Sequence, residues 1–130
     1  LIIGPGDLFS TVLPVLIVPA IKKLISTSRT LKIFIVNVAN KPFETTNFKV
    51  SDYLKTIKNH LEGDFFDKII VNINNRVTIP AGLNYSYVAY DERNLSSYSN
   101  LIVKGDYIDK KFPIYHDSVK IATEITTQIQ

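Results

Sequence analysis

Two short runs of almost continuous apolar residues constrain the fold of this chain more than any other feature. They are KIFIVNV at residues 32–38 and KIIVNI at residues 68–73, and a shorter run at residues 1–3 precedes a Gly-Pro-Gly turn. Strands with one exposed face alternate apolar and polar residues, whereas strands that are buried on both faces do not. The sequence therefore predicts an α/β fold in which these runs form a parallel sheet covered on both sides.

Helical patterns fill the segments between the three runs. Residues 8–25 are mostly apolar but contain two prolines, so we expect two short helices, the second starting near Pro19. Ser51 fits the N-cap of the next helix, Asp52 fits its first turn, and Gly63 fits its end. The alternation of strand and helix predicts a doubly wound, mainly parallel sheet with flanking helices.

The remainder of the chain is predicted to hold shorter elements and one last helix. Residues 76–84 are predicted as a loop, and residues 85–90 and 101–103 as short strands. Asp117 can cap a final helix. Four apolar residues share one face of that helix: Val119, Ala122, Ile125 and Ile129.

Composition excludes several classes of protein and of site. The chain has no Cys, which excludes disulfides, a thiolate nucleophile and Cys-ligated zinc. Its net charge is +3 with no basic run longer than a pair, so we expect no nucleic-acid partner. The longest apolar run, residues 12–21, is shorter than the ~20 residues of a membrane span and contains two prolines. We therefore expect no membrane segment, and no signal peptide is visible.

The start of the chain is unusual for a translated protein. There is no Met, and Leu1 opens directly into an apolar strand. Hydrophobic residues make up 45% of the chain, which is enough to build a core. We expect residues 1–130 to form a single α/β unit that is a fragment or a processed product of a longer protein.

Three loops are expected to converge at one edge of the predicted sheet. In doubly wound sheets, ligands bind beyond the carboxyl ends of the strands. The loops that follow the three apolar runs lie at residues 4–11, 37–49 and 72–80. A ligand site, if the chain has one, is predicted where these loops meet.

The first loop reads Gly4-Pro5-Gly6-Asp7-Leu8-Phe9-Ser10-Thr11. Glycines let a backbone approach a ligand closely, and free N–H groups at a helix start attract an anion such as a phosphate. Ser10 and Thr11 add hydroxyl donors. The alternative is a turn with ordinary capping, which the tripeptide alone favours, because it is neither a Walker loop nor a dinucleotide-binding fingerprint.

The second loop carries a single acidic residue, Glu44, beyond the end of a buried strand. Glu44 could ligate magnesium, bind a ribose or accept a proton, and Asn37 and Asn40 could hold a base or a sugar. Hydroxyls in or after the loop could bond phosphate oxygens: Thr45, Thr46 and Ser51. The equally weighted alternative is a solvated loop followed by a capped helix.

Three further groups favour structural roles. The amides of residues 72–75 follow a strand, where Asn is common for local backbone reasons. His116 and Asp117 resemble an acid–base pair, but adjacent residues rarely hydrogen-bond in triad geometry and Asp117 suits an N-cap. Tyrosines are frequent between residues 85 and 115, and alternating ones such as Tyr85 and Tyr87 more often pack on a strand face.

Taken together, the first two loops resemble a known family. The segment GPGDLFSTVLPVLIVPAI, followed by NVANKPFETTNFKVSDYLKTI, resembles the gluconeogenesis-factor branch of the 2-phospho-L-lactate transferase superfamily (CofD-like, UPF0052). That family has a GPG-[SD]-L-[YF] turn and a later N-x-x-x-x-P-G-E-T-x-x-[YF]-x-x-S-D-H stretch. His116-Asp117 before a helix also matches. The resemblance is dense over residues 1–61 and thin over residues 63–111, and it corresponds to the C-terminal part of the family fold.

The resemblance implies a Rossmann-like fold, a cytoplasmic protein and a homodimer. It also implies a nucleotide-linked ligand. The residues that would face it in the first loop are Gly4, Gly6, Asp7, Ser10 and Thr11. In the second loop and the helix that follows they are Asn37, Glu44, Thr45 and Asp52.

Three positions depart from the family pattern. Phe43 stands where the family usually has Gly, Thr46 where it often has Asp, and Tyr53 where it often has His. A side chain at position 43 is expected to keep the backbone there further from a ligand.

The resemblance supports three interpretations of function. The leading one is a regulatory protein of carbon metabolism and cell-wall control that binds a uridylylated sugar (a UDP-sugar). The alternative is an enzyme that transfers a phospholactyl group to a deazaflavin, with magnesium held by Asp7, Glu44 or Asp52. The third is a degenerate domain kept for protein contacts, which Phe43 and Thr46 suggest and which would bind no small molecule.

Overall fold

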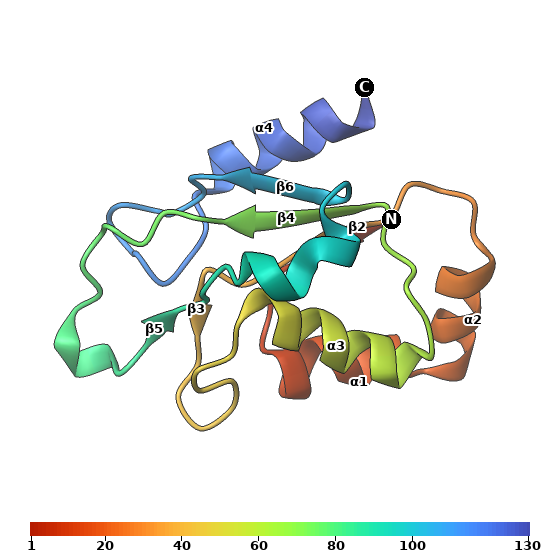
Figure 1. Cartoon of the computed structure of the whole chain (residues 1–130), viewed down its shortest axis with the longest axis horizontal. Helices are drawn as coiled ribbons and strands as arrows, with labels where there is room; N and C mark the ends of the chain where they lie inside the picture. Colours follow the sequence, from red (N-terminus) through yellow and green to blue (C-terminus); the bar gives the residue numbers. More distant parts are fainter.

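Four parallel strands form the central sheet of the computed structural model, which describes residues 1–130. In spatial order they are β1 (Ile2–Ile3), β2 (Ile33–Ile35), β4 (Lys68–Asn72) and β6 (Ile102–Gly105), and every neighbouring pair is parallel (Figure 1). The three apolar runs are therefore adjacent strands, as the sequence indicates.

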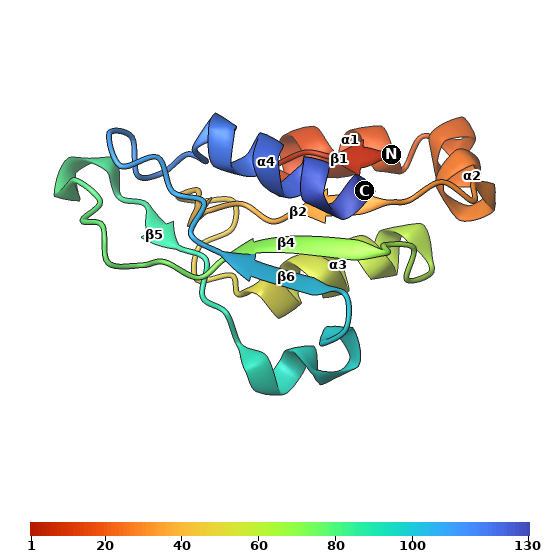
Figure 2. The same cartoon turned by 90° about the horizontal axis from the view of Figure 1, so that it is seen from above.

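Helices cover both faces of this sheet. One face carries η1 (Leu8–Val12), α1 (Leu13–Leu16), α2 (Pro19–Thr27) and α3 (Val50–Leu61), whereas α4 (Ser118–Ile129) lies on the other face (Figures 1 and 2). Right-handed crossovers between strands that follow one another in a single direction place their helices on the same face. Because α4 follows the last strand, no crossover constrains it. The predicted α/β class with a parallel sheet and flanking helices is confirmed.

Strand β2 shows why the apolar runs are continuous. Phe34 and Val36 belong to the larger core under α1 and α3, whereas Ile33 and Ile35 pack with Ile121 of α4. Successive side chains point to opposite faces, so a strand covered on both faces needs apolar residues throughout.

The proline-rich segment folds as two helices, and the second begins at Pro19 as predicted. No single helix is long and apolar enough to cross a bilayer. Residues 8–16 and 19–27 reach the length and apolarity of a span only together, and the chain bends by 73° between them.

The start of α3 corrects the prediction that Ser51 is its N-cap. Lys49, not Ser51, precedes the helix, and the Asp52 carboxylate accepts a hydrogen bond from the Lys49 N–H at 2.8 Å. Ser51 instead donates to the Asp91 carboxylate through both its N–H and its hydroxyl, at 3.1 and 2.5 Å. The helix ends at Leu61, close to the end predicted from Gly63, and Glu62 follows it in the left-handed conformation (φ 62°). Because Asp91 binds Ser51, the helix starts after Lys49 and not after Ser51 as predicted.

The shorter elements agree with expectation in part, since strands were predicted at residues 85–90 and 101–103 and are found at residues 86–87 and 102–105. A two-stranded antiparallel ribbon joins β3 (Ala39–Asn40), inside a segment predicted as a loop, to β5 (Ser86–Tyr87). Two 3₁₀ helices follow β4 in the chain: η2 (Ala81–Leu83), within the predicted loop 76–84, and η3 (Glu92–Tyr98). The ribbon stands beyond the carboxyl ends of β4 and β6 (Figure 2). It places the second loop over the edge where a ligand site was predicted.

The last helix is capped as predicted, but the face that it packs against the sheet differs in part from the predicted apolar face. The Asp117 carboxylate accepts hydrogen bonds from the N–H groups of Val119 and Lys120 at 3.0 and 3.1 Å. Of the four residues predicted to share its apolar face, Ile125 packs against the core, whereas Val119 is 73% exposed and Ile129 is 62% exposed. Ile121 is the buried residue, because its side chain meets the apolar face of β2.

Candidate functional site

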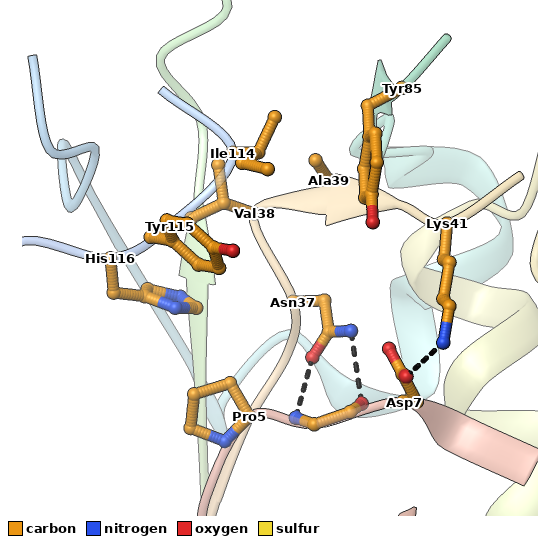
Figure 3. Close-up of a pocket in the computed structure, with 11 residues that line it drawn as sticks. Pro5, Asp7, Asn37, Val38, Ala39, Lys41, Tyr85, Ile114, Tyr115 and His116 are labelled. Carbon is orange, nitrogen blue, oxygen red and sulfur yellow. Dashed lines mark hydrogen bonds and ion pairs between the residues drawn. The ribbon is translucent and has the colours of Figure 1, made fainter. Parts of the chain in front are cut away.

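A cleft of about 510 Å³ opens at the carboxyl ends of β1 and β2 (Figure 3). Its lining comes from residues 5–7 of the first loop, residues 37–39, Lys41, Tyr85 and residues 114–116. Parallel strands end at the same edge of a sheet, which is why loops far apart in sequence meet here. The cleft combines the first two predicted loops with a third segment that comes from the end of the chain.

Gly6 and Asn37 join the first two loops. The Gly6 N–H donates to Asn37 Oδ1 at 3.0 Å, and Asn37 Nδ2 donates to the Gly6 carbonyl at 3.0 Å (Figure 3). These bonds pin the loop after β1 to the loop after β2. Asn37 thus lies in the cleft as predicted, but its amide is engaged by the protein backbone.

Glu44 occupies the anion position that the sequence assigned to a ligand phosphate. Its Oε1 accepts hydrogen bonds from Phe9 N (3.0 Å), Ser10 N (2.9 Å) and Ser10 Oγ (3.1 Å) at the start of η1. The Glu44 side chain is only 13% exposed. Two groups predicted separately, the free N–H groups and the acidic residue, therefore satisfy one another.

Lys41 links Glu44 to Asp7 across the mouth of the cleft. Its ammonium donates a hydrogen bond to Asp7 Oδ2 and lies 3.6 Å from Glu44 Oε2. The hydrogen bond with Asp7 raises the pKa of Lys41 above its usual value. Lys41 is the one Lys or Arg side chain in the cleft lining, and sequence reasoning missed it. Its position directly after β3 would have been a signal only if the ribbon had been predicted.

Buried polar residues support the second loop from below. Thr45 is 1% exposed, and its Oγ1 accepts a hydrogen bond from Lys41 N at 3.1 Å. The Tyr53 hydroxyl lies 3.2 Å from both Thr45 Oγ1 and Asn40 Oδ1. Burial raises the pKa of Tyr53 to about 12. The structure places Thr45, predicted to face a ligand, beneath the loop, because its hydroxyl closes the turn on Lys41.

The remaining predicted site residues lie outside the cleft lining. Gly4 and Thr11 are exposed, and Asp52 is engaged at the start of α3. Asp7, Glu44 and Asp52 do not form a group of three carboxylates that could hold a metal ion. Asp7 and Glu44 instead share the Lys41 ammonium.

The third predicted loop keeps a structural role. Asn72 Oδ1 accepts a hydrogen bond from Tyr107 N at 3.0 Å, and Asn72 Nδ2 donates to the Asn74 carbonyl at 2.7 Å. This local role is the one that the sequence favoured for the amide cluster.

Residues 114–116 bring His116 into the cleft lining, together with Ile114 and Tyr115. The Nε2 atom of His116 is buried and has no hydrogen-bond partner. Burial lowers the pKa of His116 to about 4, so the ring is neutral at pH 7. The sequence favoured a structural role for this residue. Its position before the last helix, which matches the family pattern, was the available signal.

The backbone conformation at Phe43 explains why the family usually has glycine at this position. Its φ is 65°, and its side chain is fully exposed. A left-handed conformation costs a residue other than Gly roughly 1–2 kcal/mol, and an exposed ring recovers none of this through packing. The turn therefore keeps its shape at the expense of stability.

Replacing Phe43 with Gly is expected to raise the free energy of unfolding by about 1 kcal/mol, because it relieves this strain. Urea denaturation of the two proteins measures the difference. Phe112, which is 52% exposed and has no positive φ, offers a matched control. Phe112→Gly should lower the stability or leave it unchanged, and an equal gain in both variants would contradict strain at Phe43.

Comparisons with known proteins agree on one family. The family described as 2-phospho-L-lactate transferase CofD matches residues 1–107. A putative gluconeogenesis factor of Clostridium acetobutylicum is 34% identical over 129 residues, which cover 93% of this chain and 28% of that protein. The gluconeogenesis factor of Bacillus subtilis is 30% identical over 131 residues, which cover 95% of this chain and 40% of that protein.

A solved structure shows the same fold. The crystal structure of a UPF0052 family protein from Bacillus halodurans superposes with a TM-score of 0.84 at 28% identity, covering 96% of this chain and 42% of that one. The chain therefore spans less than half the length of these relatives.

Proposed function

The chain belongs to the CofD family, which includes the gluconeogenesis factors, and from this premise we propose that its cleft binds a uridylylated sugar as a regulatory signal of carbon metabolism and cell-wall control. The proposal extends to the complete protein, which we expect to be cytoplasmic and homodimeric. It rests on the cleft at the carboxyl ends of β1 and β2, where ligands of open α/β sheets bind.

The position of Lys41 is the observation that carries the proposal. A single ammonium lies in the cleft lining beside the backbone of residues 5–7, held between two carboxylates. Its side chain is 41% exposed, so it can turn towards an incoming diphosphate without leaving a buried position. A lysine placed in this way is a point charge for a phosphate group.

The remainder of the lining suits the uncharged parts of such a ligand. Tyr85 and Tyr115 extend from opposite sides of the cleft (Figure 3), and aromatic faces pack on bases and on sugar rings. The volume of about 510 Å³ falls within the roughly 300–1,000 Å³ of small-molecule sites. Beside the Asp7 carboxylate, the cleft thus offers one cationic group and two aromatic faces to a ligand that is anionic at one point and ring-shaped elsewhere.

The transferase interpretation draws on the description of the matching family. It needs magnesium, for which Asp7 and Glu44 would be the nearest oxygen ligands. Both carboxylates are paired with Lys41, and Glu44 also accepts three hydrogen bonds from residues 9 and 10. A metal would have to displace these partners, which is why the binding function is the better supported of the two.

Replacing Lys41 with Met in the complete gene product is expected to weaken binding of a UDP-hexose about tenfold or more. A hydrogen bond to a charged group is worth about 1.5–3 kcal/mol, and 1.4 kcal/mol corresponds to tenfold. Isothermal titration calorimetry with UDP-hexose, and with GDP as the competing nucleotide, measures the change.

Lys23→Met is the matched control, because Lys23 is exposed on α2 and lies outside the cleft lining. The affinity of the Lys23→Met variant for UDP-hexose should equal that of the unsubstituted protein. If the Lys41→Met variant bound UDP-hexose with unchanged affinity, Lys41 would have no role in binding the ligand. Binding of GDP but not of UDP-hexose, with turnover that depends on magnesium and a deazaflavin acceptor, would favour the transferase. If the protein bound neither UDP-hexose nor GDP, the interpretation as a degenerate interaction domain would be favoured.

A further inference from the structure

The cleft contains a buried polar atom that the protein leaves without a partner. His116 Nε2 is the only buried side-chain nitrogen or oxygen of the chain that makes no hydrogen bond. Leaving such an atom unpaired costs stability, and in native structures an exception of this kind calls for a specific cause. His116 lines the cleft, and Figure 3 shows its ring directed from the loop towards the interior of the cleft.

The Val36 backbone lies beside the His116 ring. It raises the pKa of His116, as a carbonyl oxygen does, and so opposes the larger effect of burial. The Val36 N–H already donates to the Ile70 carbonyl at 3.0 Å, so the Val36 carbonyl is the group left to accept. Because Nε2 has no partner, we infer that Nδ1 carries the ring proton and is directed towards the Val36 carbonyl. In a neutral imidazole the other nitrogen is then a lone-pair acceptor.

We propose that His116 is a specificity-determining residue of the cleft, whose Nε2 accepts a hydrogen bond from a hydroxyl or amide N–H of the bound ligand. The inference rests on the proposed function, since it concerns the same cleft. A UDP-sugar offers such donors in its sugar hydroxyls and in the N–H of its base. Lys41 recognises the charge of the ligand, whereas His116 recognises an uncharged donor. The two residues lie on different segments and contribute separately.

Two substitutions of similar size separate binding from packing. In His116→Asn the amide can replace Nδ1 as the donor to Val36 but leaves the Nε2 position empty. In His116→Gln the longer side chain can place its carbonyl oxygen near the Nε2 position. Asn is therefore expected to weaken binding of UDP-hexose about tenfold in the complete protein, as expected for one hydrogen bond. Gln should restore most of the affinity.

The same titration with UDP in place of UDP-hexose shows which part of the ligand donates the hydrogen bond to His116. A loss in His116→Asn with UDP-hexose but not with UDP would place the donor on the sugar, and a loss with both would place it on the nucleotide. Equal affinities of His116→Asn and the unsubstituted protein for both ligands would overturn the role of His116 alone. Absence of any binding by the unsubstituted protein would overturn the proposed function, and the ligand assignment with it.

A second measurement needs no ligand. Two-bond ¹H–¹⁵N correlation spectra of the histidine rings report the tautomer, and His116→Asn assigns the signals. The proton is expected on Nδ1 with Nε2 unprotonated. A proton on Nε2, or a charged ring at pH 7, would overturn the assignment of Nε2 as an acceptor, whatever the outcome of the titrations.

Discussion

Replacing Glu44 with Gln is expected to lower the free energy of unfolding by about 2 kcal/mol, although the side chain lies on a loop. Its carboxylate accepts three hydrogen bonds from Phe9 and Ser10 and lies beside the Lys41 ammonium. Hydrogen bonds to charged groups contribute about 1.5–3 kcal/mol, and a negative charge at a helix start is favourable. Gln keeps the size of the side chain and one of its two oxygens. The decrease in unfolding free energy therefore measures the contribution of the negative charge.

Urea denaturation of the complete protein gives the difference in unfolding free energy. Glu62→Gln is the control, because the Glu62 side chain is 80% exposed and pairs only with Lys22. That variant should change the stability by less than about 0.5 kcal/mol. A second test uses sulfate. If Glu44 is the internal anion of the first loop, sulfate should stabilise Glu44→Ala more than the unsubstituted protein. Equal stabilities of Glu44→Gln and the unsubstituted protein would refute this role.

Replacing Gly105 with Ala is expected to destabilise the protein by about 2–4 kcal/mol and to loosen α4. A Cβ at position 105 would lie 2.4 Å from Cζ and 2.5 Å from the hydroxyl oxygen of Tyr107. Tyr107 is 4% exposed, packs with Ile121 and donates to Glu124 Oε2 at 3.0 Å. The ring cannot move without leaving this place under α4, so the cost is that of an overpacked core with a lost hydrogen bond.

Thermal unfolding and amide hydrogen exchange measure this effect, and exchange should increase most in α4. Gly82→Ala is the control, because a Cβ there would meet no atom within 4 Å. The double variant Gly105→Ala/Tyr107→Leu should lose less stability than the sum of the two single changes, because Leu lacks the atoms that clash. Strict additivity of the two changes would argue against contact with Tyr107 as the cause.

The strands and most helices could be predicted because their signals are local. The runs at residues 32–38 and 68–73 are almost continuously apolar because α3 and α4 cover opposite faces of the sheet. Pro19 and Asp117 mark helix starts through their own backbone chemistry, and both predictions are confirmed. The predicted N-cap at Ser51 is wrong because Asp91, forty residues later, binds the Ser51 N–H and hydroxyl.

The cleft was predicted in its position but only partly in its residues. Gly6, Asp7 and Asn37 lie in its lining, because they belong to the loops that follow strands β1 and β2. Glu44 and Ser10 were both predicted as ligand groups, but they bind one another. A sequence shows that two groups are complementary to a ligand, but it does not show that they are also complementary to each other.

The sequence alone determined the family, the parallel sheet and the edge at which a site would form. These depend on short-range patterns: apolar runs, prolines, capping residues and two motifs within residues 1–61. Only the tertiary structure decided that Glu44 closes the anion position of the first loop, that Lys41 faces the cleft, and that His116 brings an unpaired nitrogen into it. The physical reason is that these roles depend on which polar groups already have partners, and the partners of Glu44 and Lys41 in the first loop lie 34 or 35 residues away along the chain.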